Sequence, residues 1–186
     1  MATNLLLHKR TPWTAQDWLE LPDDGRRYEI TAGALLMAPP RSPLHQAVTD
    51  EIRQLLRPAL PKHLRVQENT GVRLGDNLRI PDLVVLRAEA VWRPGALLAE
   101  DVLLVVEVVS PSSAQEDRVA KPAQFARAGV AHYWMVDPAD GPCVHVLRLT
   151  GTVYERSHLG RGEDVLALRE PVEVRFTPAS LLPPAP

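Results

Sequence analysis

The segment VLLVVEVV, residues 102–109, restricts the possible folds of this chain more than any other stretch. A continuous apolar run of this length is typical of a strand buried on both faces, in the middle of a sheet covered by helices. Glu107 is anomalous within it, because burying an ionised carboxylate without a compensating partner is strongly unfavourable. The fold must therefore give Glu107 an ion pair, a hydrogen-bond network or a metal ion.

Capping and turn signals divide the rest of the chain into alternating helices and strands. Thr14 and Asp17 have capping-box spacing, which predicts a short helix. Ser42 followed by Pro43 starts a helix that should end near Arg57, before Pro58. Ser113 and Glu116 predict another helix over 114–128. Strands are predicted as hairpins over 26–38 and across 75–77, and at 63–68, 78–86, 102–109 and 132–138, before a C-terminal β meander. This order predicts an α/β fold, a mixed β-sheet flanked by α-helices.

Size and composition favour one intracellular domain. The 186 residues, 45% of them hydrophobic, suit a single domain over 13–180, with a flexible N-terminus at 1–12 and a loose tail at 181–186. The one cysteine, Cys143, excludes a disulfide framework and a Cys-rich zinc site, and fits the cytoplasm. No apolar segment approaches the ~20 residues of a membrane span. The net charge of -2 provides no general cationic field, so a nucleic-acid partner needs a local patch or bound metal ions.

Three acids and one lysine form a candidate metal site. Asp82 follows Pro81 at the start of an apolar run, where proline indicates a strand edge or bulge that redirects a side chain. Glu29 lies in the strand-like RRYEI, and Lys121 lies on the helix that follows the Glu107 strand. Carboxylates bind Mg²⁺ through oxygen, and the metal activates water and neutralises phosphoryl charge. A nearby lysine stabilises developing negative charge.

Each of the three acids also has a structural interpretation. Glu107 is compatible with a core salt bridge to an arginine or to Lys121. Asp82 is compatible with capping the turn after Pro81, and Glu29 with a position facing solvent, since RRYEI alternates. The sequence alone leaves these alternatives open.

Two further residues are possible accessories. His45, three residues after Ser42, is placed to approach a phosphate at a helix N-terminus, although a lone helical histidine is more often a surface or packing residue. Asp117 precedes Lys121 by four residues, a spacing that also suits an ordinary helix pair worth roughly 0.3–0.5 kcal/mol.

Five motifs, RRYEI, RIPDLVVL, VVEVVSPSS, DRVAK and GVAHYWMVDP, occur in this order between about Trp13 and Tyr154. The series resembles the Uma-two-type putative restriction endonuclease family of the PD-(D/E)XK nuclease superfamily. The resemblance implies a restriction-endonuclease-like fold and a Mg²⁺- or Mn²⁺-dependent endonuclease that hydrolyses DNA phosphodiester bonds. It also implies a homodimer, because members of the superfamily commonly cut two strands.

The resemblance also implies roles for individual residues. Asp82 and Glu107 become the metal-binding acids, with the carbonyl of Val108 as a further oxygen ligand. Lys121 becomes the charge-stabilising lysine, and Glu29 matches an early acid that assists a metal through water.

The sequence departs from the superfamily pattern at three positions. Val109 stands where the pattern has lysine, which in the closer family lies on the following helix, where Lys121 fits. Pro122 follows Lys121 and interferes with a helix, and Phe125 stands where a tyrosine is expected. These departures keep a second hypothesis open, in which the same fold is a catalytically inactive nucleic-acid- or protein-binding module.

Overall fold

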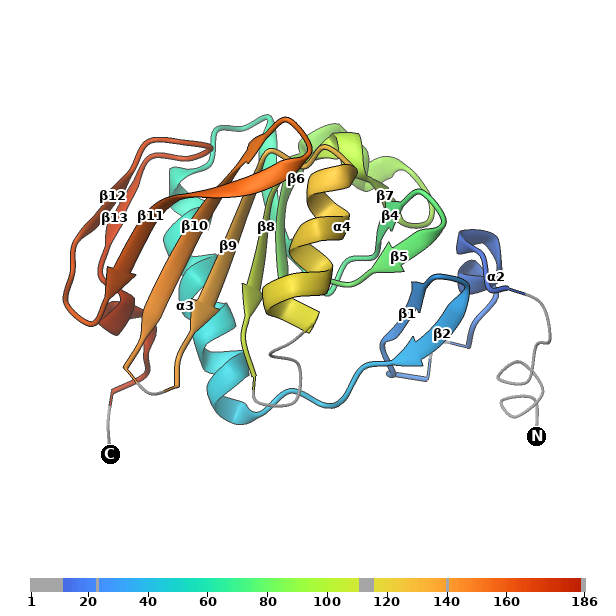
Figure 1. Cartoon of the computed structure of the whole chain (residues 1–186), viewed down its shortest axis with the longest axis horizontal. Coiled ribbons are helices and arrows are strands. Elements are labelled where there is room, and N and C mark those ends of the chain that lie inside the picture. Colours follow the sequence, from blue (N-terminus) through green and yellow to red (C-terminus); the bar gives the residue numbers. More distant parts are fainter. Residues whose placement is uncertain (1–11, 23, 111–115, 140, 185–186) are drawn as a thin grey trace.

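Strand β8 (Val102–Val108) lies inside a six-stranded sheet, as its apolar sequence predicts. The computed structural model describes residues 12–22, 24–110, 116–139 and 141–184. The strand order is β11-β10-β9-β8-β6-β3, and β8 pairs parallel with β9 while the other pairs are antiparallel. The remaining strands of this sheet are β3 (Leu64–Glu68), β6 (Leu83–Arg87), β9 (His132–Asp137), β10 (Cys143–Thr150) and β11 (Val153–Arg161) (Figure 1).

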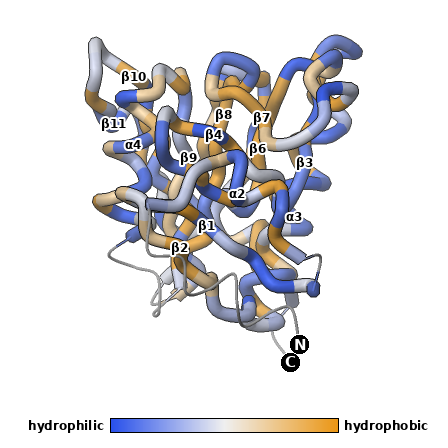
Figure 2. Tube along the Cα trace, turned by 90° about the vertical axis from the view of Figure 1, so that its right-hand side faces the viewer, coloured by the Kyte–Doolittle hydropathy of each residue, from blue (hydrophilic) through white to orange (hydrophobic). Residues whose placement is uncertain are grey.

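Helices α3 (Pro43–Ala59) and α4 (Lys121–Arg127) cover opposite faces of this sheet. Side chains alternate along a strand, so Leu104 and Val106 join the core on the α3 side, and Val105 joins the core on the α4 side. Figure 2 shows β6 and β8 as hydrophobic segments between the more polar outer parts of the chain. Glu107 follows Val105 by two residues, so its side chain lies on the same face of the sheet, toward α4.

A second, five-stranded sheet holds the N-terminal hairpin. Its order is β2-β1-β5-β4-β7, with β4 and β7 parallel. Ala32 and Gly33 both have positive φ, the conformation that a tight two-residue turn between antiparallel strands requires. The strands are β1 (Tyr28–Thr31), β2 (Ala34–Met37), β4 (Val72–Leu74), β5 (Asn77–Arg79) and β7 (Leu97–Leu98).

The shorter elements complete the fold. Helix α2 (Ala15–Leu19) starts at the predicted capping box, and Trp18 donates a hydrogen bond to the Tyr28 carbonyl. The hairpin of β12 (Leu166–Leu168) and β13 (Val174–Phe176) packs into the core on the α3 side, where Phe176 stacks on Trp134. Single helical turns are formed by Ala88–Trp92, Ala99–Asp101, Glu116–Ala120 and Pro178–Leu181.

The predicted fold class is confirmed: a mixed sheet is flanked by helices, and strands form the C-terminal part. The single strand predicted over 78–86 is wrong, because the chain leaves the five-stranded sheet after Arg79 and enters the other sheet at Leu83. The predicted end of α3 is also wrong, since Pro58 lies within its last turn and removes only one terminal hydrogen bond.

The start of α4 differs from the prediction as well. The residues before Lys121 form a π-helical turn, and the α-helix begins at Lys121 with Pro122 in its first turn. Proline is tolerated there because the first N–H groups of a helix have no partner within it. Ser113, the predicted cap, lies outside the described residues.

The expected flexible ends fall largely outside the described residues, at 1–11 and 185–186. Leu181, the first residue of the expected tail, is buried in the core on the α3 side. Among the residues that the structure describes, no helix is both long and apolar enough to cross a membrane.

Candidate active site

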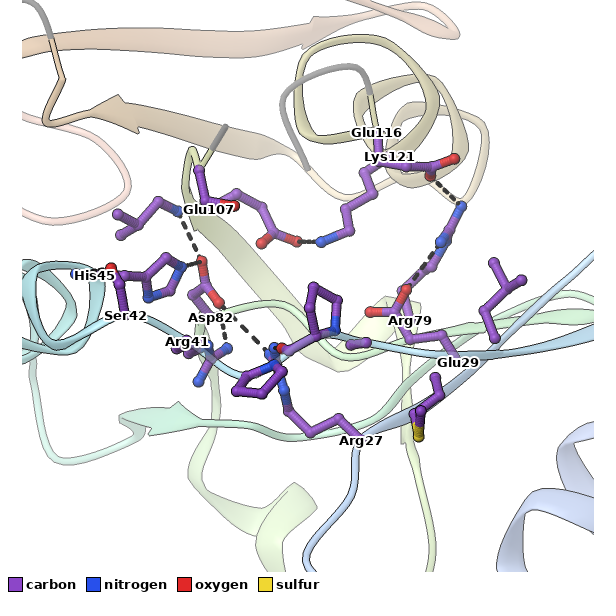
Figure 3. Close-up of a pocket in the computed structure, with 17 residues that line it drawn as sticks. Arg27, Glu29, Arg41, Ser42, His45, Arg79, Asp82, Glu107, Glu116 and Lys121 are labelled. Carbon is purple, nitrogen blue, oxygen red and sulfur yellow. Dashed lines mark hydrogen bonds and ion pairs between the residues drawn. The ribbon is translucent and has the colours of Figure 1, made fainter. Parts of the chain in front are cut away.

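The crossing between the two sheets places Asp82 at the edge of a cavity. The chain passes through Ile80 and Pro81, and the N–H of Ile80 donates to Glu29 Oε1 at 3.0 Å. Pro81 has no N–H to contribute to a ladder, so the strand breaks there. Asp82 is buried and lines a cavity of about 370 Å³ that also contains Glu29, Glu107 and Lys121 (Figure 3).

The Asp82 carboxylate is surrounded by positively charged and N–H groups. Oδ2 accepts from the Val108 N–H at 2.8 Å and lies 3.0 Å from His45 Nε2. Oδ1 contacts the guanidinium of Arg41 and lies 3.9 Å from Arg27 Nη1. Burial by itself raises the pKa of Asp82, but the His45 hydrogen bond, the Arg41 charge and the Val108 N–H outweigh burial and lower the pKa to about 2. Asp82 is therefore ionised at neutral pH.

Glu107 and Lys121 form a buried ion pair across the same cavity. Glu107 is only 1% exposed, and its Oε1 lies 2.9 Å from Lys121 Nζ. The pair forms because Glu107 faces α4 and Lys121 lies in the first turn of that helix. This ion pair explains how a carboxylate is accommodated in an apolar strand. Both of its residues were predicted as site residues from the sequence.

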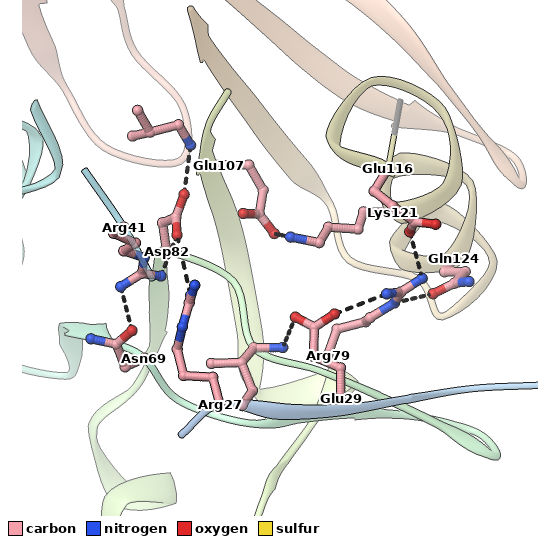
Figure 4. A network of polar contacts seen from close by, with 12 residues as sticks. Arg27, Glu29, Arg41, Asn69, Arg79, Asp82, Glu107, Glu116, Lys121 and Gln124 are labelled. Atoms are coloured by element: carbon pink, nitrogen blue, oxygen red, sulfur yellow. Dashed lines mark hydrogen bonds and ion pairs between the residues drawn. The ribbon is translucent and has the colours of Figure 1, made fainter. Parts of the chain in front are cut away.

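Arg79 ties three elements together beside this pair. Its side chain is 1% exposed, and Nη1 lies 2.9 Å from Glu29 Oε2. On the helical side, Nη2 lies 3.0 Å from Glu116 Oε2 and Nε donates to Gln124 Oε1 at 2.7 Å (Figure 4). Glu116 and Gln124 lie before and after Lys121 in the chain, so Arg79 fixes the segment that carries this lysine.

The structure brings most of the predicted site residues to one cavity. Its lining includes Glu29, His45, Asp82, Glu107, Val108 and Lys121. Glu29 is buried rather than solvent-facing, and both its oxygens accept hydrogen bonds from the protein. The side chain of Asp117 lies outside what the structure describes. Phe125 is buried against Tyr133 and does not line the cavity.

Sequence reasoning missed several cavity residues. Arg27 lies in the strand-like RRYEI, Arg41 precedes the predicted helix start at Ser42, and Glu116 was assigned to a capping box, so none of the three was predicted as a site residue. Arg79 did have a signal: it is a charged residue inside the predicted strand 78–86, the same anomaly that marked Glu107.

The donor set fits a hard cation such as Mg²⁺. Asp82 and Glu107 supply carboxylate oxygens at one cavity, and Mg²⁺ is usually held by one or two carboxylates with water and substrate phosphate completing its shell. Within the described parts of the chain, no cluster of three or more His, Cys, Asp or Glu side chains could hold a metal ion.

The six-stranded mixed sheet, its two covering helices and the charged cavity define an α/β protein with a polar site at the crossing of two sheets. The sequence model of the Uma2 family, described as "Putative restriction endonuclease", matches residues 15–182. The chain belongs to this family.

One solved structure supports the fold. The crystal structure of a protein described as "a putative nuclease belonging to DUF820" from Anabaena variabilis ATCC 29413 superposes with a TM-score of 0.75 at 20% identity. The match covers 91% of this chain and 97% of that one. No curated protein matches this chain.

Proposed function

We propose that this protein is a Mg²⁺- or Mn²⁺-dependent endonuclease that hydrolyses DNA phosphodiester bonds. The observation that carries the proposal is the meeting of Asp82, Glu107 and Lys121 at one cavity, from three separate elements. Membership of a family described as restriction endonucleases supports the same reaction class.

The proposed roles follow from the contacts. Asp82 and Glu107, with the carbonyl of Val108, would hold the metal, which when bound supplies charge neutralisation and activates water. Lys121 Nζ stabilises negative charge that develops on the phosphoryl oxygens. Glu29 acts as a positioning residue, because its two oxygens hold Arg79 and the Ile80 N–H that precedes Asp82.

Mn²⁺ titration by calorimetry tests the metal site without requiring a known substrate. Wild type is expected to bind Mn²⁺, and Asp82→Asn and Glu107→Gln are each expected to abolish measurable binding, since each removes one of two carboxylates. Glu170→Gln, which alters an exposed pair with Arg148 outside the cavity, is the control and should bind like wild type. The titration is repeated with a DNA duplex present, because substrate phosphate can complete the shell.

The alternative is a binding module on the same fold, and its specific support is that cationic groups already neutralise both acids. Such a module would bind nucleic acid equally well with EDTA and with Asp82→Asn. No Mn²⁺ binding in either titration, together with that insensitivity, would overturn the nuclease proposal.

The proposal includes a homodimer, because two sites are needed to cut both strands of a duplex in one encounter. Light scattering at working concentration is expected to give twice the mass of one chain. A monomer that still cuts both strands would contradict this part and leave the cleavage proposal intact.

A further inference from the structure

Positive charge is concentrated at one end of the cavity. Two guanidinium groups and an imidazole converge on the single carboxylate of Asp82. At the other end the balance is reversed, with Arg79 between Glu29 and Glu116. The cavity is therefore polarised, and its Asp82 end favours an additional anion.

Arg27 has the least compensated charge of this group. Its Nη1 is 3.9 Å from Asp82, and its Nη2 donates to the neutral carbonyl of Pro39 at 3.0 Å. Arg27 and Arg41 both approach Asp82 Oδ1, and a bound anion would relieve the repulsion between the two guanidinium groups. The Arg27 side chain remains 23% exposed, which leaves it accessible.

A second hollow continues from this end of the cavity. It has a volume of about 700 Å³ and shares Arg27, Pro40 and Arg41 with the cavity. Arg26 also lines it, with a half-exposed side chain whose Nε lies 3.7 Å from Asp24 Oδ2.

The two acids of this second hollow share one arginine. Asp50 and Glu68 line the hollow, and both pair with Arg53, at 2.5 Å and 2.8 Å, so their negative charge is compensated only in part. Three arginines, Arg26, Arg27 and Arg41, line the same hollow and outnumber these two carboxylates.

We propose that Arg27 and Arg41 form a subsite for a phosphodiester group next to the one that is cleaved, and that the second hollow guides the polynucleotide strand away from the cavity. Guanidinium groups match phosphate oxygens in geometry as well as in charge. This inference rests on the proposed function, because it assigns the path of a substrate whose cleaved bond lies between Asp82 and Lys121.

The test measures DNA binding without turnover. Binding of a fluorescein-labelled DNA duplex is followed by anisotropy in EDTA over a range of KCl concentrations. Each phosphate contact contributes about 0.9 to the slope of log affinity against log salt, so Arg27→Gln is expected to reduce the slope by about that amount. Arg27→Lys should retain most of the slope, and Arg175→Gln, on the β12–β13 hairpin, should behave like wild type.

A second measurement identifies the phosphate. Single methylphosphonate linkages are neutral, and one placed at the contacted phosphate should weaken binding by wild type but not further weaken binding by Arg27→Gln. An unchanged salt slope in Arg27→Gln, or duplex binding that is undetectable in wild type, would overturn the subsite.

The two proposals can fail separately. Metal-dependent cleavage by wild type with an unchanged slope in Arg27→Gln would remove the subsite and leave the nuclease. A reduced slope in a protein that binds no Mn²⁺ would retain the phosphate subsite and remove the nuclease.

Discussion

Lys121→Met is expected to lower the free energy of unfolding by about 3–5 kcal/mol, because it removes one member of a buried ion pair and keeps the Glu107 carboxylate in the core. The expectation depends on burial, since Glu107 is 1% exposed and the pair distance is 2.9 Å. Metal-dependent cleavage should also fall about 10²–10³-fold, the usual cost of removing one charge-stabilising group. Urea unfolding and single-turnover cleavage measure the two effects.

The double variant Glu107→Met/Lys121→Met separates structure from catalysis. Replacing a buried ion pair with apolar groups of similar volume is often nearly neutral, so most of the lost stability should return. Cleavage and Mn²⁺ binding should both be absent in the double variant, because the proposed metal-binding acid and the lysine are both missing. Recovery of cleavage along with stability would mean that the pair is a core salt bridge and not part of an active site.

Arg79→Met is expected to have the second large effect, a loss of about 3–5 kcal/mol of unfolding free energy. It removes a fully buried guanidinium and leaves Glu29, which is also buried, without its charge partner. Arg79→Lys should recover part of the stability, because lysine restores the positive charge. It has no planar guanidinium group to contact Glu29, Glu116 and Gln124 at the same time. Arg148→Met is the control, because Arg148 and Glu170 form an ion pair with both side chains exposed, and the change should cost at most about 1 kcal/mol.

In the proposed enzyme, Arg79 would act only through the position of Lys121, so Arg79→Met is expected to give a specific pattern of effects. In Arg79→Met, amide hydrogen exchange should accelerate over 116–127. Cleavage should fall about 10–100-fold, the usual effect of removing a residue that orients a functional group through a hydrogen bond. DNA affinity in EDTA should remain near the wild-type value, because Arg79 lies at the end of the cavity away from Arg27. Exchange that accelerates equally throughout the sheet would indicate a general loss of stability instead.

Residue patterns predicted the centre of the fold well, because burial leaves a clear signature there. The apolar run around Glu107 could only be an inner strand, and the acids at 82 and 107 were selected because they contradict their apolar surroundings. The same reasoning failed where tertiary contacts determine the structure. The strand predicted over 78–86 is divided between two sheets. Glu29 is buried at the crossing between these sheets, and no local pattern indicates that crossing. Arg27 and Arg41 belong to the site only because the N-terminal hairpin and the start of α3 meet at Asp82.

The distribution of the site over the chain has a consequence for folding. Arg27, Arg41, Asp82, Glu107 and Lys121 come from a hairpin, a helix start, a sheet crossing, an inner strand and a second helix start. The five residues span 27–121, and contacts so distant in sequence form late because closing long loops costs entropy. A chain still emerging from the ribosome therefore carries only separate, solvated charges, and the charged cavity exists only when folding is complete.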